Sequence, residues 1–261
     1  MSGAPPLVAE VEFAELAESL RSCVLAYYRL TGEEPEGANA QRTLDTNSTL
    51  VEQRANSLLR IAIEDGGGTL RGRRVLDLGC GFGALAVYFA AHGAEVVGID
   101  ANGERIAVGR EVAARHGLDA RFRRGRFERL DVGAREFDVV LHNNSLCYVI
   151  GRETRRRALA EARCALRPGG LLLMRNPNRW NPRDQFTGLP LITLLPPRAA
   201  WTVARGLGRK RSRVRLTSPP AARRELRAAG FSDVRPIDAA DGSGRLRAVA
   251  RYQQLSARRP S

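Results

Sequence analysis

The stretch from Val75 to Gly83 reads Val-Leu-Asp-Leu-Gly-Cys-Gly-Phe-Gly and decides the fold class. A short apolar strand runs into three glycines at alternating positions, Gly79, Gly81 and Gly83. A backbone without Cβ atoms can turn sharply there and present its amide groups to a ligand. An apolar helix is expected over 84–92. We therefore interpret the stretch as a strand-to-helix turn that binds a nucleotide-containing cofactor.

The next strand supports this interpretation, because Val96 to Asp100 reads Val-Val-Gly-Ile-Asp. Asp100 follows the middle glycine by about 20 residues, the spacing at which a carboxylate binds ribose hydroxyls in such units. Gly79, Gly81 and Ala84 also satisfy the looser Gly-x-Gly-x-x-Gly/Ala pattern of dinucleotide sites. The glycines alone therefore leave a nicotinamide cofactor open.

Two further features distinguish the cofactors. Asp77 lies two residues before the first glycine, and a carboxylate there suits a cationic ammonium and sulfonium but repels a pyrophosphate. Residues 166–170 read Leu-Arg-Pro-Gly-Gly before the apolar run 171–174, as at a helix end, a turn and a buried strand. Over residues 74–176, and more weakly at the C-terminal end, the chain resembles the class I methyltransferases that use S-adenosylmethionine (SAM).

The alternation of strands and helices agrees with the fold that this resemblance implies. We expect an α/β, Rossmann-like, doubly wound sheet of seven mostly parallel strands, closed by an antiparallel hairpin and preceded by an N-terminal helical cap. Residues 1–70 are assigned to the cap, with helices at 10–30 and 48–63, and residues 71–261 to the methyltransferase domain. Strands are expected at 74–78, 95–99, 120–123, 137–142 and 171–175, with the closing hairpin at 231–237 and 246–252.

The resemblance also implies which residues hold the cofactor. Arg126 stands where many relatives have an aspartate that accepts the adenine amino group, so we expect Arg126 to cover the adenine and Phe127 to stack on it. Cys80 is interpreted as a small apolar filler rather than a nucleophile. The predicted cofactor-binding residues are Asp77, Gly79, Cys80, Gly81, Gly83, Asp100, Ala101, Arg126, Phe127 and Asn143.

The segment from Leu141 to Tyr148 lies at the end of the fourth strand, where these enzymes position cofactor and acceptor. It contains neither Asn-Pro-Pro-Tyr nor a Pro-Cys pair, which disfavours amino-methylation of adenine or glutamine and cytosine C5 chemistry. His142 has two interpretations, a general base and a structural histidine, of which we favour the second. Tyr148, Asn178 and Trp180 are the predicted substrate residues.

Composition restricts the remaining function classes. The formal charge is +14, but 42 Lys and Arg include one lysine, Lys210, as a GC-rich coding sequence would produce. Nucleic acid is therefore a disfavoured partner. The four cysteines and three histidines show no metal-ligand spacing, so no metal is expected. The acidic N-terminal stretch and the lack of an apolar run of about 18 residues predict a cytoplasmic protein.

Residues 176–217 do not fit the alternation and are interpreted as an insertion, or flap, within the domain. They contain both tryptophans, Trp180 and Trp201, and nine Arg or Lys against a single acid, Asp184. A short helix is expected over 197–207, with Trp201, Ala204 and Leu207 on one face. The combination of apolar residues, tryptophan and cationic charge over 189–215 is typical of a segment that contacts a membrane surface.

The sequence therefore predicts a SAM-dependent methyltransferase that resembles the ubiquinone and menaquinone biosynthesis type. The expected acceptor is a small or amphipathic metabolite, lipid-linked molecules included, methylated on oxygen. An RNA methyltransferase is the second hypothesis, and a SAM-binding protein without catalysis is the third. The oligomeric state is left open.

Overall fold

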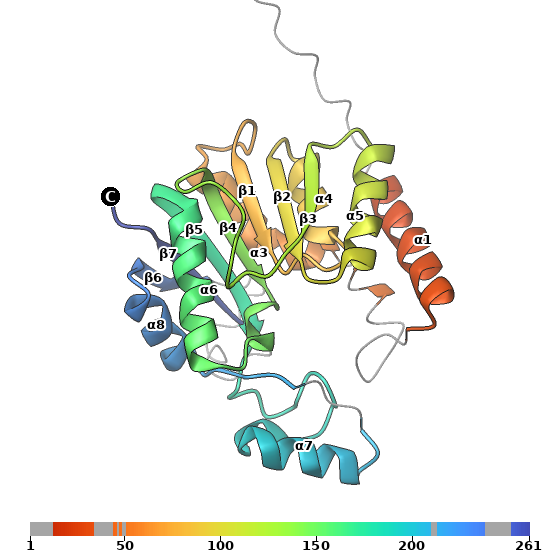
Figure 1. Ribbon diagram of the computed structural model, residues 1–261, viewed down its shortest axis with the longest axis vertical. Coiled ribbons are helices and arrows are strands. Elements are labelled where there is room, and N and C mark those ends of the chain that lie inside the picture. Colours follow the sequence, from red (N-terminus) through yellow and green to blue (C-terminus); the bar gives the residue numbers. More distant parts are fainter. Residues whose placement is uncertain (1–12, 34–43, 46, 49–50, 210–212, 238–251) are drawn as a thin grey trace, which may run out of the picture.

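The computed structural model describes residues 13–33, 44–45, 47–48, 51–209, 213–237 and 252–261, with the backbone alone for 51–56. Its centre is a seven-stranded sheet in the order β3-β2-β1-β4-β5-β7-β6 (Figure 1). The parallel strands are β1 (Arg74–Leu78), β2 (Glu95–Asp100), β3 (Ala120–Arg124), β4 (Phe137–Asn143) and β5 (Leu166–Pro177). This confirms the predicted fold.

The chain order creates a switch point between β1 and β4. From β1 the chain moves outward through β2 to β3, and then crosses to the other side of β1 to form β4. Ligands of doubly wound sheets bind at the carboxyl ends of the strands beside such a point. Each residue of β4 from Phe137 to His142 is buried, as expected for a strand covered on both faces.

Helices cover both faces of the sheet. On one face α4 (Ala84–Ala91), α5 (Gly103–Arg115), α1 (Phe13–Thr31) and α3 (Val51–Asp65) share a core with alternate residues of the strands, including Val75, Leu141 and Leu173. On the other face α6 (Arg152–Ala165) and α8 (Pro219–Ala228) pack against Leu76, Val140 and Leu172. The two-residue period of the strands thus divides the apolar side chains between two cores.

The predicted cap helices are present, with shifted boundaries. Helix α1 packs beside α5 at the β3 edge of the sheet, and its apolar stripe of Leu16, Leu20 and Val24 is buried (Figure 1). Helix α3 contacts α4 and buries Leu58 and Ala62. Both helices therefore contribute to the same core as the sheet. The first residues of the cap, 1–12, which include the start of the helix predicted at 10–30, lie outside the described part of the chain.

The closing strands are β6 (Ser232–Pro236) and β7 (Tyr252–Arg258), and β7 pairs antiparallel with both β5 and β6. Of the residues predicted for this second strand, 246–252, all but Tyr252 lie outside the described ranges, and the described part of the strand covers Tyr252–Arg258. Leu255 and Ala257 alternate with partly exposed residues and face the core, so burial fixes this register.

The insertion at 176–217 forms a projection beyond the carboxyl ends of the parallel strands. It contains the short η2 (Ile192–Leu194) and α7 (Pro197–Gly206), which lies below the sheet in Figure 1. Ile192, Ala200 and Ala204 form a small core with Leu189 packed against it. Of the three residues predicted to share a face of this helix, Ala204 is buried, Trp201 is partly exposed, and Leu207, which follows the last helical residue, is 60% exposed.

Candidate functional site

The three glycines after β1 have different structural roles, although all have positive φ angles. A Cβ at Gly79 would lie 2.3 Å from the Cβ of Ser145, and one at Gly83 would lie 2.6 Å from the Phe122 ring. A Cβ at Gly81 would meet nothing within 4 Å. Two glycines therefore permit close packing of the loop, and the space beside the middle one is open.

Asp100 is fixed at the end of β2 by the glycine loop and by the helix that follows. One carboxylate oxygen accepts a hydrogen bond from the Gly81 N–H at 2.9 Å, and the other accepts one from the Asn102 N–H at 2.9 Å. Asn102, not Asp100, caps α5, since its side chain accepts from the N–H groups of Glu104 and Arg105. The carboxylate predicted to bind ribose is therefore held beside the glycine loop.

Asp77 is the second carboxylate of the site and is 1% exposed. Burial, together with the nearby charge of Asp100, raises the pKa of Asp77 to about 7. Its Oδ1 atom has no hydrogen-bond partner among the described residues. A buried carboxylate oxygen without a partner is costly, and a cationic ammonium group is a suitable partner for it.

Cys80 lies between the two carboxylates in sequence and near them in space. Burial, and then the charges of Asp77 and Asp100, raise the pKa of the Cys80 thiol well above its ordinary value. The thiol is therefore protonated at neutral pH and is a poor nucleophile. Its sulfur is 3.0 Å from the position that a Cβ on Gly98 would occupy, which supports the interpretation of Cys80 as a packing residue.

The residues predicted for the adenine side have different environments. The Phe127 ring lies edge-to-face with the His142 ring, with centroids 5.7 Å apart, and is also close to Gly79. The Arg126 side chain is 74% exposed and its Nε is 2.6 Å from Glu128 Oε1. Ala101 is exposed at the end of β2, where its carbonyl accepts from Arg124. The structure thus brings Phe127, but not the Arg126 guanidinium, into the described contacts of the glycine loop.

His142 is completely buried near the end of β4. Its Nδ1 is 2.9 Å from Ser145 Oγ, and its Nε2 has no hydrogen-bond partner among the described residues. Burial, with a smaller effect of the Arg155 charge, lowers the pKa of His142 to about 3. The imidazole is therefore neutral at pH 7 and is a weak base, which favours a positioning role over general-base catalysis.

The predicted substrate residues are divided between the end of β4 and the insertion. Tyr148, in η1 (Leu146–Tyr148), is 46% exposed and lies 6.5 Å edge-to-face from Phe186 of the insertion. Asn178 is 1% exposed and accepts a hydrogen bond from the Trp180 N–H, so it organises the turn at the start of the insertion. Trp180 itself is 42% exposed. The predicted cofactor residue Asn143 is half-buried beside β5, and its Oδ1 lacks a described partner.

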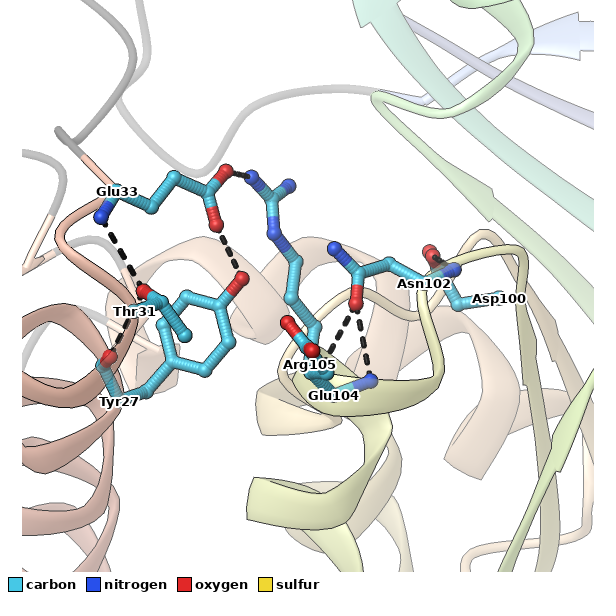
Figure 2. A network of polar contacts seen from close by, with 7 residues as sticks. All are labelled: Tyr27, Thr31, Glu33, Asp100, Asn102, Glu104 and Arg105. Atoms are coloured by element: carbon cyan, nitrogen blue, oxygen red, sulfur yellow. Dashed lines mark hydrogen bonds and ion pairs between the residues drawn. The ribbon is translucent and has the colours of Figure 1, made fainter.

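Three residues that were not predicted from the sequence, Tyr27, Glu33 and Arg105, connect α1 with α5, the helix that follows β2. Figure 2 shows the Glu33 carboxylate between the Tyr27 hydroxyl and the Arg105 guanidinium. Glu33 and Arg105 are 72 residues apart, and no local spacing relates them. A fourth residue that was missed, Arg175, is 8% exposed at the carboxyl end of β5, with its guanidinium 4.0 Å from the Tyr252 ring centroid.

A cavity of about 610 Å³ lies elsewhere, between α3 and the closing strands. Its lining includes Asp65, Leu171 and Arg258, and no residue of the glycine loop or of the carboxyl end of β4. Asp65 is paired with both Arg73 and Arg258. Asp65 and Arg258 thus hold α3 to the sheet, and the cavity is separate from the candidate site.

Comparison with known proteins relates this geometry to a family. Residues 75–170 match a family model described as a methyltransferase domain. A ubiquinone biosynthesis O-methyltransferase of Cereibacter sphaeroides is 38% identical over 113 residues, which are 43% of this chain and 44% of that protein. The match therefore spans less than half the length of the curated relative.

Solved structures show the same fold. The 1,6-didemethyltoxoflavin N1-methyltransferase of Burkholderia thailandensis, crystallised with 1,6-didemethyltoxoflavin and S-adenosylhomocysteine, superposes with a TM-score of 0.57 at 23% identity, covering 99% of this chain and 94% of that one. A (4+2)-cyclase superposes with a TM-score of 0.56 at 18% identity, covering 100% and 99%. The chain thus carries a methyltransferase domain at residues 75–170, within the seven-stranded fold of the SAM-dependent methyltransferases.

Proposed function

We propose that the protein is a SAM-dependent methyltransferase that methylates an oxygen of a small or amphipathic metabolite. The observation that carries the proposal is the buried carboxylate of Asp77 beside a glycine loop and a second carboxylate, Asp100. Asp77 offers an anionic partner for an ammonium group and Asp100 one for ribose hydroxyls, whereas the two carboxylates would repel a pyrophosphate. The residues therefore fit SAM better than a nicotinamide dinucleotide.

The chain's own residues bind and orient rather than react. When bound, SAM supplies a methyl group already activated on a sulfonium, so positioning and exclusion of water can provide most of the acceleration. In this proposal Asp77 holds the amino group, Asp100 the ribose, and Phe127 the adenine, while the open backbone at Gly81 lies against the cofactor. The remaining cofactor residues of the proposal are Gly79, Cys80, Gly83, Ala101, Arg126 and Asn143.

The acceptor is proposed to lie between the end of β4 and the insertion. Tyr148 and Phe186 come together there from η1 and the insertion, and the Arg215 N–H donates to the Cys147 carbonyl at 2.8 Å. The insertion is therefore attached to the segment that follows β4. The O-methyltransferase name of the relatives is the reason for preferring oxygen as the methylated atom. His142, Tyr148, Asn178 and Trp180 stay predicted residues of this region.

The insertion is also proposed to contact a membrane surface or the apolar part of an amphipathic acceptor. Its exposed apolar side chains include Leu191, Leu194 and Leu207, at 58%, 53% and 60% exposure. Trp201 lies beneath two guanidinium groups, those of Arg205 and Arg213. Lys210 and Arg211, which are also basic, lie outside the described part of the chain. No helix within the described ranges is long and apolar enough to cross a membrane. The contact is proposed to be peripheral, and the protein cytoplasmic.

Binding and transfer assays test the proposal separately. Calorimetry with S-adenosylhomocysteine should show binding, and NADH should show none; NADH that competes at similar affinity would overturn the cofactor assignment. Incubation of the protein with methyl-labelled SAM and a cell extract should label a small or lipid-extractable molecule. Label that enters RNA instead would favour the second hypothesis.

Binding without labelling of any molecule would favour a non-methylating protein. The structural likeness to a (4+2)-cyclase is the specific reason to retain this alternative, because one fold hosts different reactions. The RNA hypothesis rests on net charge alone. It predicts binding that weakens steeply with salt, since counterions are released from phosphates.

A further inference from the structure

The turn after the C-terminal end of α1 directs the Glu33 side chain back toward α1 and α5. Gly32 has a φ of +64°, and its N–H donates to the Tyr28 carbonyl at 3.1 Å. The Thr31 hydroxyl donates to the Tyr27 carbonyl at 2.9 Å and accepts from the Glu33 N–H at 3.2 Å. A left-handed glycine after a helix reverses the chain in this way. Glu33 is consequently fixed close to Tyr27, one helical turn before the end of α1.

The Glu33 carboxylate joins two elements. One of its oxygens accepts from the Tyr27 hydroxyl of α1 and the other from the Arg105 guanidinium of α5 (Figure 2). The side chains of Glu33 and Arg105 are 33% and 27% exposed, so their ion pair is partly shielded from water. Burial alone would raise the pKa of Glu33, but the hydrogen bonds from Tyr27 and Arg105 outweigh it and lower the pKa. Glu33 is therefore ionised at neutral pH.

Phe82 connects the same groups to the glycine loop. This residue lies between Gly81 and Gly83 and is 4% exposed. Its ring centroid is 5.0 Å from that of Tyr27 in an edge-to-face contact, and the Arg105 guanidinium lies 5.5 Å from it. Tyr27 and Arg105 thus contact both the Glu33 carboxylate and the aromatic ring of the loop.

A chain of hydrogen bonds returns from Arg105 to the glycine loop. The Arg105 backbone N–H donates to the Asn102 side-chain oxygen at 3.0 Å, and the Asn102 backbone N–H donates to the Asp100 carboxylate at 2.9 Å. Asp100 in turn accepts from the Gly81 N–H at 2.9 Å. The contacts form a closed ring that runs from Glu33 through α5 and Asp100 to the loop, and through Phe82 back to α1.

We propose that Glu33 and Arg105 are positioning residues that couple the docking of α1 to the binding of the cofactor. The inference rests on the proposed function, because it takes the cofactor to bind at Asp100 and the glycine loop. Neither residue needs to touch the cofactor: Glu33 acts through Tyr27 and Arg105, and the Arg105 guanidinium acts through the Phe82 ring of the loop. Coupling between two sites is reciprocal, so the cofactor must also stabilise the docked end of α1.

Calorimetry with S-adenosylhomocysteine tests the first half of the coupling. Glu33→Gln and Arg105→Gln should each raise its Kd by about 10-fold, within the usual range of coupling between sites. The double variant should be little worse than the worse single one, because both changes remove the same interaction. Glu64→Gln is the matched control, since it breaks an exposed Arg60–Glu64 pair of 2.8 Å and should leave the Kd unchanged.

Hydrogen exchange tests the reciprocal half. S-adenosylhomocysteine should slow exchange of the amides at 27–33 in the wild type and in Glu64→Gln, and this protection should be lost in Glu33→Gln. A purely structural ion pair would lower the melting temperature without changing either the Kd or the ligand-dependent protection, and that result would overturn the inference. If Glu33→Gln does not fold, Tyr27→Phe is the alternative variant. It removes the hydroxyl that donates to Glu33 and should raise the Kd by about 3-fold. A wild type that binds no S-adenosylhomocysteine would refute the proposed function instead.

Discussion

The Asp77 carboxyl holds a proton that the cofactor should displace. Its pKa of about 7 lies above the ordinary 3.8, so between pH 4 and 7 the folded protein binds more protons than the unfolded chain. This group therefore lowers the free energy of unfolding as pH rises through that window. An ammonium group at Asp77 would favour the ionised form, so S-adenosylhomocysteine should bind more tightly as pH rises from 6 to 7.5, with release of a proton.

Calorimetry at pH 6.5 in buffers of different ionisation enthalpy measures that proton. Asp77→Asn should abolish the release and weaken binding by about 2 kcal/mol, the usual worth of a charge-assisted hydrogen bond. Asp119→Asn, which changes an exposed carboxylate paired with Arg121, is the control and should behave as the wild type. An observed heat independent of buffer in the wild type would show that the ammonium does not meet Asp77.

Substitution of His142 should change the pH dependence of the free energy of unfolding more than it changes the rate of turnover. Its pKa of about 3 lies below the ordinary 6.5, so between those values the unfolded chain binds a proton that the folded protein excludes. The stabilising contribution is present above pH 6.5 and is lost as pH falls. Denaturant unfolding at pH 7 and pH 5 should therefore show a smaller pH-dependent loss in His142→Gln than in the wild type, by about 1 to 2 kcal/mol. Equal losses would contradict the buried, neutral histidine.

In the turn between β1 and α4, alanine substitutions at Gly83 and Gly81 should affect different properties, the first mainly stability and the second mainly cofactor binding. Gly83→Ala places a Cβ 2.6 Å from Phe122 and 2.9 Å from the Gly109 Cα, so it should destabilise the protein by about 3 kcal/mol. The Cβ of Gly81→Ala would have no atom within 4 Å. Only the backbone φ of +57° should lower its free energy of unfolding, by about 1 kcal/mol. Gly81→Ala should nevertheless lose most S-adenosylhomocysteine binding. Retained binding in folded Gly81→Ala would place the cofactor away from this turn.

The elements predicted from the sequence are those whose signals are local. The parallel strands and α7 follow from apolar period and from turn residues, and β1 and α7 begin where they were expected. The stretch that forms β7 is selected by pairing with β5, a distant segment, which a local pattern does not encode, and residues 246–251 of the prediction lie outside the described ranges. The ring through Glu33 and Arg105 was missed for the same reason. Side-chain direction at Arg126, which pairs with Glu128, also depends on contacts that spacing does not encode.

The molecule as a whole presents the insertion on the side of the sheet where the strands carry their carboxyl ends, beyond the candidate site (Figure 1). Leu194, Val203 and Leu207 are exposed there, while Ala200 and Ala204 hold α7 to Ile192. Arg198 and Arg209 are exposed on the same segment. Each basic residue near an anionic bilayer contributes about 1 kcal/mol, so charge and buried apolar area are both needed for stable attachment.

Co-sedimentation with liposomes should therefore depend on both kinds of side chain. The wild type should sediment with vesicles that contain anionic lipid, and salt should reduce the bound fraction. Leu194→Ser with Leu207→Ser, and separately Arg198→Glu with Arg209→Glu, should each reduce binding by about 10-fold, as expected for the loss of one to two kcal/mol. Leu30→Ser is the matched control, because Leu30 is 87% exposed on α1, away from the insertion. Equal, negligible sedimentation of all variants at low salt would leave the insertion as a cover for a soluble acceptor, and the search for the methylated molecule would then move from lipids to small polar metabolites.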